Sequence, residues 1–316
     1  MADLILHHYL GSPFSEKVRL ILGYKKLAWK SVLVPRFSPK PDVVVLTGGY
    51  RKTPFLQIGA EIYCDTALIA DVLEHLQPTP TIYPETCKGM ARILAQWADT
   101  TLFWSAVKHD LGPQGAITKF GGAAPEVANA ILEDRKAMGI DLTGLNPADS
   151  SAAYKSYLRR LSHMLHGQPY LLGNAPAIAD FSAYHALWLV QVRTQPAVDL
   201  LQHLPDLAAW LERMRAIGHG SVETIDAAQA IAIAANAEPA PAGQGLLRDS
   251  GFQDEHGIAL GSRVSVAADN FGLEPSEGEL IAATRTHYSL RRTDPRTGTV
   301  HVHFPRIGYV LRRITL

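Results

Sequence analysis

A serine at a turn is the first residue of this 316-residue chain whose setting suits chemistry. The apolar run 4–6 predicts a buried strand, and Gly11, Ser12 and Pro13 mark a turn after it. Pro13 suits the first position of a helix, because its missing N–H would have no helical partner there. Ser12 is then the expected N-cap. Its hydroxyl lies where free N–H groups and the helix dipole attract an anion.

The helix that begins at Pro13 has to position this serine. Apolar side chains recur in it at a spacing of i, i+4, i+7 and i+8, which predicts one buried face. They are Phe14, Val18, Ile21 and Leu22. Residues 28–34 predict a second strand, and residues 35–52, which are rich in Pro and Gly, predict a loop.

A second group of reactive side chains follows a predicted hairpin. Segments 53–58 and 61–64 are short apolar runs joined by a Gly-Ala turn, which is typical of paired antiparallel strands. Asp65 or Thr66 is expected to cap the helix that follows. The order is therefore strand, helix, strand, and then strand, strand, helix. This order predicts a thioredoxin-like α/β domain.

Three stretches of the chain resemble the glutathione-binding domain of the glutathione transferases. They are SPFSEKVRLIL, KTPFLQIGAEIYCDT and the helix after it, and they cover roughly residues 3–77 in the family's order and spacing. The resemblance implies that glutathione is the co-substrate and that an electrophilic small molecule is its partner in the reaction. It also implies a second, all-helical domain and a homodimer.

The resemblance assigns a catalytic role to a hydroxyl. Ser12 matches the activating serine of zeta- and theta-like members, where omega-like members have a cysteine. Only a few per cent of a free thiol is ionised at neutral pH, and a hydroxyl at a helix N-terminus favours the thiolate. Tyr9 is the alternative, because tyrosine-type members place their hydroxyl at the end of the first strand. The remaining interpretation is that Ser12 only caps the helix.

The resemblance also implies where glutathione lies. Thr53 and Pro54 match the family's Val-Pro pair, whose proline is cis and whose preceding residue pairs with the cysteinyl backbone of glutathione. Asp65 and Thr66 match the pair that receives the γ-glutamyl end, with Asp65 on the ammonium and Thr66 on the carboxylate. A bare helix cap is the alternative role for this pair.

Three further residues belong to the implied glutathione site. Lys52 and Arg36 are candidates for the glycyl carboxylate, and Phe14 is expected beside glutathione directly after the turn at Ser12. Cys64 is interpreted as buried strand packing rather than as a redox centre. The absence of a cysteine at position 12 argues against disulfide reductase activity.

The middle of the chain predicts helices after a proline-rich linker at 77–84. Helices are expected over 86–108, 125–138, 148–166, 204–217 and 221–237. In the resembling family the first of these lines the electrophile pocket, which makes Trp104 and Lys108 candidates for substrate contact. An aromatic core stripe is the alternative for Trp104. Asp180 matches a buried capping motif in which Ala177 replaces the usual hydroxyl residue, so Asp180 is a structural residue.

The last seventy residues are not predicted by the resemblance. Alternation and turns indicate strands over 262–267, 278–284, 288–292, 299–304 and 309–314. We expect a small β-barrel-like accessory module, SH3-like or OB-like, that packs on the catalytic part, covers its pocket or joins the dimer. His301 and His303 share a strand face, but we expect a solvated or packed pair rather than a metal site.

Composition excludes several classes of function. Thirty basic and thirty acidic residues cancel, so no global field attracts nucleic acid, and we expect none to bind. Seven arginines and two acidic residues lie in 278–316, but six acidic residues and two arginines lie in 245–277. No run approaches a membrane span of about 20 apolar residues. Two cysteines and the absence of a secretory signal pattern predict a cytoplasmic protein.

The sequence therefore predicts three domains and two functions. Residues 1–78 are expected to be the thioredoxin-like glutathione-binding domain, 85–237 the all-α domain and 246–316 the β-rich module. The first function is a glutathione transferase that stabilises the glutathione thiolate without a metal. The alternative is a glutathione-transferase-like binding or regulatory protein without efficient catalysis, because a fold alone does not determine function.

Overall fold

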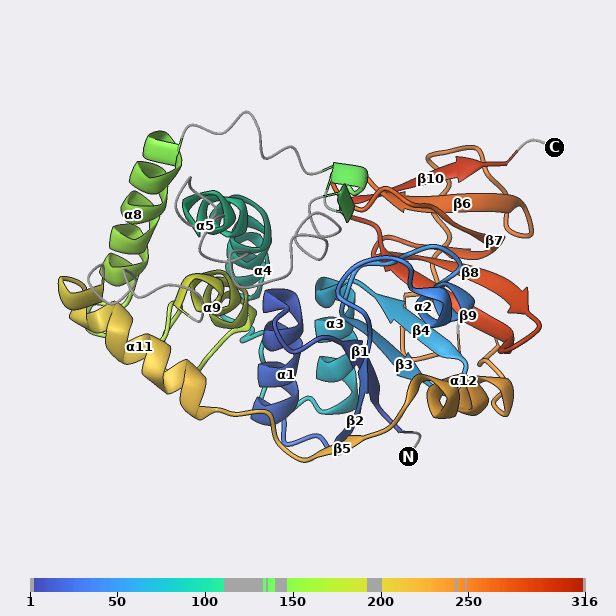
Figure 1. Ribbon diagram of the computed structural model, residues 1–316, viewed down its shortest axis with the longest axis horizontal. Coiled ribbons are helices and arrows are strands. Elements are labelled where there is room, and N and C mark those ends of the chain that lie inside the picture. Colours follow the sequence, from blue (N-terminus) through green and yellow to red (C-terminus); the bar gives the residue numbers. More distant parts are fainter. Residues whose placement is uncertain are drawn as a thin grey trace.

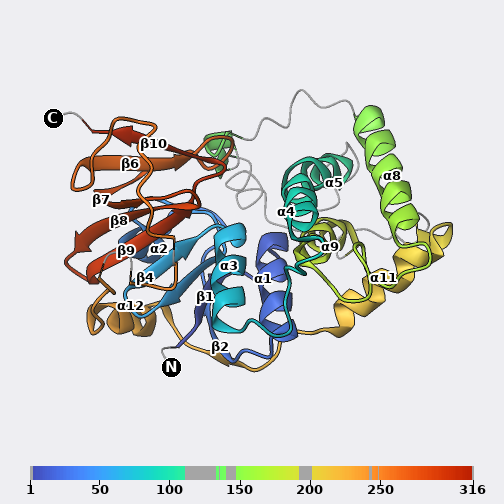
Figure 2. The same ribbon diagram turned by 180° about the vertical axis from the view of Figure 1, so that it is seen from behind.

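The N-terminal part has the predicted thioredoxin-like order. The computed structural model describes residues 3–110, 133–134, 136–139, 147–191, 201–241, 244–247 and 249–314 (Figures 1 and 2). The N-terminal elements are β1 (Ile5–His8), α1 (Pro13–Tyr24), β2 (Trp29–Leu33), β3 (Phe55–Ile58), β4 (Glu61–Cys64) and α3 (Thr66–Leu76). Strand β1 pairs in parallel with β2 and antiparallel with β3, and β3 pairs antiparallel with β4.

The expected loop over 35–52 contains a short helix, α2 (Pro41–Thr47). Pro41 opens it, and Gly48 ends it in the left-handed conformation, with φ of +82°. Val43 and Leu46 are buried against the sheet. The prediction of a plain loop was wrong here, because a helix of seven residues is too short for helical periodicity to be visible in the sequence.

The sheet separates two hydrophobic cores. Leu6 and Tyr63 face a core shared with α1, α3 and the helical part of the chain. Ile5 and Ile62, their neighbours along the strands, face a second core that includes α2 and the C-terminal strands. Alternating residues of one strand thus serve both cores, as expected for a sheet buried on both faces.

The helical part confirms the predicted all-α organisation. Its elements are α4 (Lys88–Trp97), the π-helix η1 (Ala98–Leu102), α5 (Phe103–Asp110), α8 (Pro147–Met164), α9 (Ile178–Gln191) and α11 (Pro205–Ala216). The expected helix over 86–108 is thus an α-helix with a π-helical turn inside it. Helix α9 is central and contacts α1, α4, η1 and α5. Of the expected helix 125–138, residues 125–132 and residue 135 lie outside the described residues.

Residues 221–237 were expected to form one helix, but residues 222–224 at the start of this range form a strand. Strand β5 (Val222–Thr224) pairs in parallel with β2, and only then does α12 (Ala227–Ala235) begin. The edge of β2 would otherwise leave its backbone groups unpaired. Asp226 caps α12 in a capping box with Gln229, and α12 packs beneath the sheet against α2, β2 and β9.

The C-terminal β-rich module is confirmed, but its strands do not close into a separate barrel among the described residues. The five strands are β6 (Arg263–Ala268), β7 (Ser276–Ala283), β8 (His287–Asp294), β9 (Gly298–Pro305) and β10 (Tyr309–Arg313). Strand β9 pairs in parallel with β4, which makes one ten-stranded sheet in the order β10-β6-β7-β8-β9-β4-β3-β1-β2-β5 (Figure 1). The free edge of β4 is covered in this way.

The module is also fixed to the segment that ends α2. Ser276 Oγ donates to the carbonyl of Thr47 at 2.8 Å and accepts from the N–H of Tyr50 at 3.1 Å. Arg292 donates to the carbonyl of Val45.

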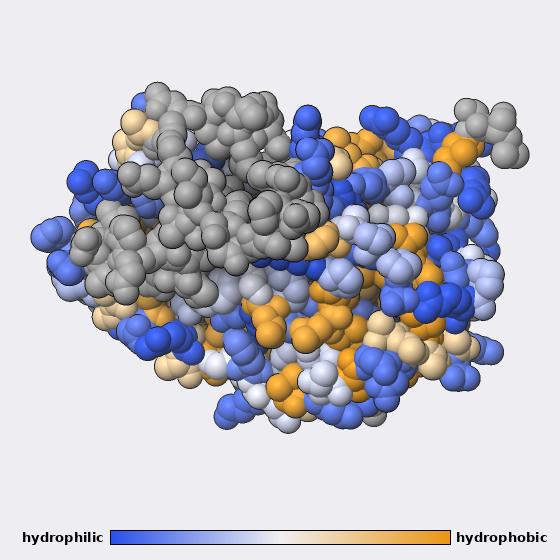
Figure 3. All heavy atoms as spheres, in the orientation of Figure 1, coloured by the Kyte–Doolittle hydropathy of each residue, from blue (hydrophilic) through white to orange (hydrophobic). Residues whose placement is uncertain are grey.

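The surface in Figure 3 carries small hydrophobic patches between hydrophilic side chains, so the coloured part of this face has no continuous apolar surface.

Candidate functional site

The turn at Ser12 has the predicted capping geometry. Ser12 Oγ accepts from the N–H of Ser15 at 3.2 Å, and its own N–H donates to the carbonyl of Tyr9 at 3.1 Å. The side chain is buried, and α1 begins at Pro13. The N-cap prediction is therefore confirmed. Accepting one N–H leaves the hydroxyl proton of Ser12 available to a bound anion.

A buried polar network holds this turn in place. Arg19 Nη2 donates to the carbonyl of Leu10 at 3.0 Å and forms an ion pair with Glu16 at 2.6 Å. Its Nη1 lies 3.0 Å from Nδ1 of His8. Burial and the charge of Arg19 lower the pKa of His8 to about 3, so His8 is neutral at physiological pH. Arg19 therefore positions the backbone between Tyr9 and Ser12.

Strand register brings the separate candidates together at the same end of three neighbouring strands, β1, β3 and β4. His7 of β1 lies opposite Phe55 of β3, and Phe55 lies opposite Cys64 of β4. The end of β1, the start of β3 and the end of β4 therefore meet. These are the places of the Ser12 turn, of Thr53 and Pro54, and of Asp65 and Thr66. The peptide bond between Thr53 and Pro54 is cis, as the resemblance implied.

Asp65 is the N-cap of α3, and residues from both ends of the chain hold it. Its Oδ1 accepts from the N–H of Ala67 at 2.9 Å, and its Oδ2 accepts from the hydroxyl of Tyr309 at 3.0 Å. Its N–H donates to the Tyr50 hydroxyl at 3.2 Å. The φ of Asp65 is +77°, an uncommon conformation for a residue other than glycine, and such conformations gather at functional sites.

Lys17 is a site residue that sequence reasoning missed. Its ammonium donates to Thr66 Oγ1 at 3.1 Å and to Asp99 Oδ2 at 2.6 Å, and its side chain is fully buried. Asp99 lies in η1 and also binds Nε2 of His185 at 2.8 Å. Burial alone would raise the pKa of Asp99, but the Lys17 charge and the His185 hydrogen bond hold it below its usual value. The sequence did contain an indication of this role, because Lys17 is a charged residue on the otherwise apolar face of α1.

Lys52 lies beneath the C-terminal module rather than open to solvent. Its ammonium is 5.0 Å from the ring centre of Tyr309, 5.4 Å from that of Tyr50 and 5.7 Å from that of Phe271. Burial lowers the pKa of Lys52 from its usual value. A positive charge between aromatic rings is stabilised by their quadrupoles.

The loop between β6 and β7 connects this lysine with the helical part. Phe271 of that loop contacts Trp104 of α5 edge-on at 5.6 Å. Glu274 of the same loop forms an ion pair of 2.5 Å with Arg51, the residue before Lys52. The loop thus lies over the junction between the glutathione-site candidates and the helices.

The other predicted residues are placed as follows. The ring of Phe14 contacts those of Phe103, at 4.7 Å between centres, and His185, at 4.5 Å, in tilted arrangements. Lys108 is half-buried on α5, on the helical side. Arg36 is exposed after β2, and in the described part of the chain no hydrogen bond or ion pair joins it to the other candidates. Cys64 is buried in β4, and burial raises its thiol pKa, which fits a packing residue.

Asp180 forms the capping motif at the start of α9, and its hydrogen bonds run back to the turn before the helix. Asp180 accepts from the N–H groups of Leu171 and Ala177, each at 2.9 Å. A third donor, Nε1 of Trp210 on α11, lies 2.9 Å from Asp180 Oδ1. Burial raises the pKa of Asp180 to about 6 even though these three bonds lower it.

No group of three or more His, Cys, Asp and Glu side chains has the geometry to hold a metal ion in the described segments. Within the same segments, no helix is both long and apolar enough to span a bilayer.

Family models match both halves of the fold. Residues 6–81 match the N-terminal domain of glutathione S-transferases, and residues 148–213 match their C-terminal domain. A comparison with curated protein sequences found no similar protein.

Solved structures extend this similarity. A GST-like protein from Pseudomonas syringae is 40% identical, covers 99% of this chain and 100% of its own, and superposes with a TM-score of 0.80. Its match therefore includes the C-terminal module. A glutathione S-transferase from Rhodospirillum rubrum is 18% identical over 67% of this chain and 87% of its own, with a TM-score of 0.51. One from Methylobacillus flagellatus, with glutathione bound, is 19% identical over 68% and 99%, with a TM-score of 0.50.

Proposed function

Because this chain belongs to the glutathione S-transferase family, we propose that it binds glutathione and transfers it to an electrophilic small molecule. One observation carries the proposal: the Ser12 turn, the cis Thr53–Pro54 bond and the Asp65–Thr66 helix start share one edge of the sheet. The Methylobacillus relative was solved with glutathione bound, which supports the choice of ligand.

In this proposal each end of glutathione has its own partners. The cysteinyl backbone pairs with the backbone of Thr53. The γ-glutamyl ammonium binds Asp65, and its carboxylate binds Thr66 and the N-terminus of α3. Lys17 adds a buried positive charge beside the Thr66 hydroxyl, which supports a carboxylate at this place. Lys52 attracts the glycyl carboxylate from between its three aromatic rings.

Ser12 acts on the sulfur and forms no covalent bond itself. Its hydroxyl donates to the thiolate, and the N-terminus of α1 adds a favourable dipole. Each unit by which the thiol pKa falls corresponds to about 1.4 kcal/mol and to a tenfold larger thiolate fraction at pH values below that pKa. The thiolate then attacks the electrophile. Trp104, Lys108 and the loop residue Phe271 form the side on which the electrophile binds.

The test compares binding with turnover. We expect isothermal titration calorimetry to detect glutathione binding, and Ser12→Ala to leave the Kd within about threefold while kcat with a chlorodinitrobenzene probe falls about tenfold or more. Tyr9→Phe is the matched control and should keep its activity. Loss of activity in Tyr9→Phe with full activity in Ser12→Ala would move the role to Tyr9. Absence of binding at millimolar glutathione would contradict the proposal.

A second function has its own supporting observation. Both carboxylate oxygens of Asp65 already accept hydrogen bonds, one from Ala67 and one from Tyr309 of the C-terminal module. Such a site suits a glutathione-transferase-like protein that binds a ligand or partner without efficient catalysis. Glutathione binding in calorimetry without turnover of any of several electrophile classes would favour this alternative.

The quaternary state and location belong to the same proposal. We propose a homodimer, because dimers are usual in the family, and light scattering at micromolar concentration tests it. We propose a cytoplasmic location because both cysteines are free thiols, which suits a reducing compartment.

A further inference from the structure

A cavity lies at the other end of β4, away from the glutathione-site candidates. Its volume is about 190 Å³, and it lies between the sheet strands β4, β7, β8 and β9 and a crossing segment made of residues 240–241, 245–247 and 249–252. Glu61 begins β4, whereas Asp65 follows its end, so about 13 Å of strand separates the two places. The cavity is therefore distinct from the proposed glutathione site.

Three polar side chains form a continuous hydrogen-bonded line in the wall of this cavity. Ser289 Oγ lies 2.7 Å from Nδ1 of His303, and Nε2 of His303 lies 2.5 Å from Oε2 of Glu61. The exposed fractions of these residues are 3%, 7% and 9%. A hydroxyl, an imidazole and a carboxylate in this order are a nucleophile, a general base and the group that orients the base.

The sheet register holds this line rigidly. Ser289 of β8 lies directly opposite His303 of β9, and Tyr63 of β4 lies opposite His303 on the other side. The rings of Tyr63 and His303 stack at 4.8 Å with an interplanar angle of 18°. Paired strands and a stacked ring leave the imidazole little freedom, which is what a positioned base requires.

The charge state of Glu61 gives His303 the tautomer that a base needs. The N–H of Ala240 donates to Glu61 Oε1 at 2.8 Å, and His301 Nδ1 lies 3.4 Å from the same oxygen. Burial would raise the pKa of Glu61, but the hydrogen bonds of His301 and His303 lead the opposing effects that bring it to about 2. The ionised carboxylate accepts Nε2–H of His303, which leaves Nδ1 to accept the proton of Ser289.

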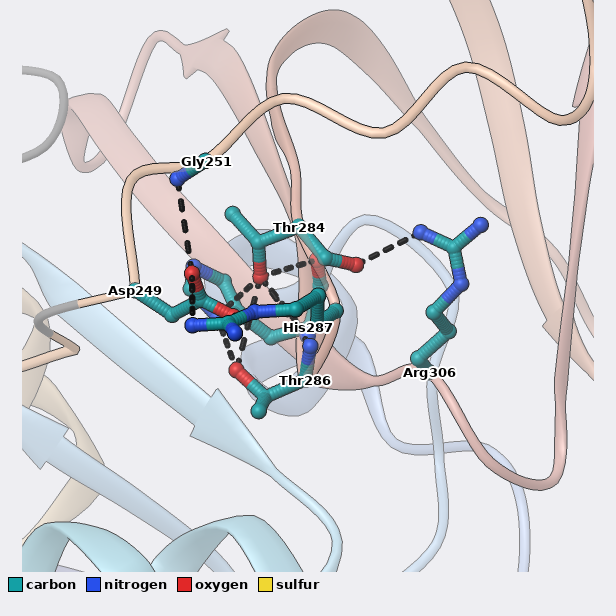
Figure 4. Close-up of polar contacts among 7 residues, drawn as sticks. Asp249, Gly251, Thr284, Thr286, His287 and Arg306 are labelled. Carbon is teal, nitrogen blue, oxygen red and sulfur yellow. Dashed lines mark hydrogen bonds and ion pairs between the residues drawn. The ribbon is translucent and has the colours of Figure 1, made fainter.

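The remaining wall suits a small acyl group. Apolar side chains of the crossing segment, of β7 and of the turn before β6 line it. Phe252 of the segment is 45% exposed, and Leu260 of the turn is 48% exposed. His287 also lines the cavity two residues before Ser289. The hydroxyls of Thr284 and Thr286 each lie 3.0 Å from its Nδ1 (Figure 4). Burial lowers the pKa of His287 to about 4, so it is a neutral donor available to a carbonyl oxygen.

We propose that this cavity is a second active site, which hydrolyses small neutral esters with a short apolar acyl group. Ser289 Oγ bonds to the carbonyl carbon while its proton passes to His303 Nδ1. The ester C–O bond breaks, and the leaving alcohol takes that proton. Water then attacks the carbonyl carbon of the acyl-enzyme and gives a proton to His303. The bond between Ser289 Oγ and the acyl carbon breaks, the carboxylic acid leaves, and the proton on His303 returns to Ser289. Glu61 orients His303 and stabilises its cation.

The experiment uses the full chain with p-nitrophenyl acetate and butyrate, and a fluorophosphonate probe read by mass spectrometry. We expect the probe to modify Ser289, and Ser289→Ala to lower kcat/KM at least 100-fold, a typical contribution of a nucleophile and its base. Glu61→Gln should lower kcat more than it raises KM. Ser265→Ala, a half-buried serine on β6, is the matched control and should keep its activity.

Glutathione calorimetry on the same variants separates this proposal from the proposed function. Unchanged glutathione binding in Ser289→Ala, together with lost ester hydrolysis, supports two independent sites. The proposal is overturned by equal hydrolysis in Ser289→Ala and the unaltered chain, by no hydrolysis above heat-denatured protein, or by a probe adduct on another residue. The probe result on the unaltered chain decides the matter even where a variant folds poorly.

Discussion

The hydroxyl of Tyr309, four residues before the end of β10, donates a 3.0 Å hydrogen bond to Asp65 Oδ2 across a sequence separation of 244 residues. The last strand of the chain therefore contributes directly to the cap of α3. The ring of the same tyrosine lies over Lys52 at 5.0 Å. The C-terminal module is thus part of the proposed glutathione site rather than an appendage.

Tyr309→Phe should weaken glutathione binding. The change removes one donor from Asp65 and leaves the ring over Lys52, so the carboxylate loses orientation while packing is kept. We expect a loss of about 1 kcal/mol, roughly fivefold in Kd by calorimetry. Tyr288→Phe, a buried tyrosine of the same module, is the control. Tighter binding in Tyr309→Phe would mean that Tyr309 competes with the ligand for Asp65, and would favour the non-catalytic function.

Lys17→Met should destabilise the protein strongly. It leaves the largely buried carboxylate of Asp99, whose side chain is 16% exposed, without its 2.6 Å partner. Removing one member of a fully buried ion pair costs about 3–5 kcal/mol, and we expect a loss near the lower end of that range. The double variant Lys17→Met/Asp99→Leu removes both charges and should regain much of the loss. Urea unfolding measures both variants. If the single variant is as stable as the unaltered chain, the ion pair does not join α1 to η1 as described.

Trp210→Phe tests how the capping motif of α9 works without its usual hydroxyl. The variant keeps an aromatic ring but loses the 2.9 Å bond from Nε1 to Asp180. A hydrogen bond to a charged, buried group contributes about 1.5–3 kcal/mol, and we expect a loss of that size in urea unfolding. Trp188→Phe, on the half-buried side of α9, should lose less than half as much. Equal losses would refute a specific role for Trp210.

Gly49→Ala should disturb the contact between the C-terminal module and the turn after α2. A Cβ at Gly49 would lie 2.0 Å from the carbonyl oxygen of Pro275, and the φ of this glycine is +152°. Gly257→Ala is the control, since its φ is +64° but nothing lies within 4 Å of the added atom. The variant at Gly49 should be about 1–3 kcal/mol less stable than the control, with faster proteolysis of the module.

Stability should fall in mild acid because of buried neutral histidines. Burial lowers the pKa of His7 from 6.5 to about 4, although its 2.8 Å contact with Gln57 opposes the shift. Below pH 6.5 His7 is protonated in the unfolded chain, whereas in the folded chain it stays neutral until about pH 4. The free energy of unfolding therefore decreases as the pH falls between these two values. Lowering the pH from 7 to 5 should cost about 2 kcal/mol through His7.

His7→Gln isolates this contribution. Glutamine cannot titrate and can still donate to Gln57, so other groups, including Asp180, titrate equally in both proteins and cancel in the comparison. Urea unfolding at pH 7 and pH 5 should show a smaller loss in the variant by about 2 kcal/mol. The same pH dependence in both proteins would show that His7 is protonated in the folded state.

Local features of the fold could be predicted from the sequence. The Ser12 and Asp65 caps, the strand–helix order of residues 5–76 and the strands of the tail depend on neighbours a few residues apart. Capping side chains reach backbone groups of their own turn, and strand alternation follows from which face is buried. The short helix α2 and the strand β5 were missed, because neither is long enough to carry a period of its own.

Only the tertiary structure decided which edges and charges meet. Nothing local to β9 specifies pairing with β4, because the partner of a strand depends on which other edge is left uncovered. The same pairing places Ser289, His303 and Glu61 in one line and brings Tyr309 to Asp65. Burial of Lys17 likewise depends on Asp99 arriving from another part of the chain. The sequence alone determined most of the elements and the proposed glutathione motif, whereas long-range pairing determined the complete site and the cavity beside Ser289.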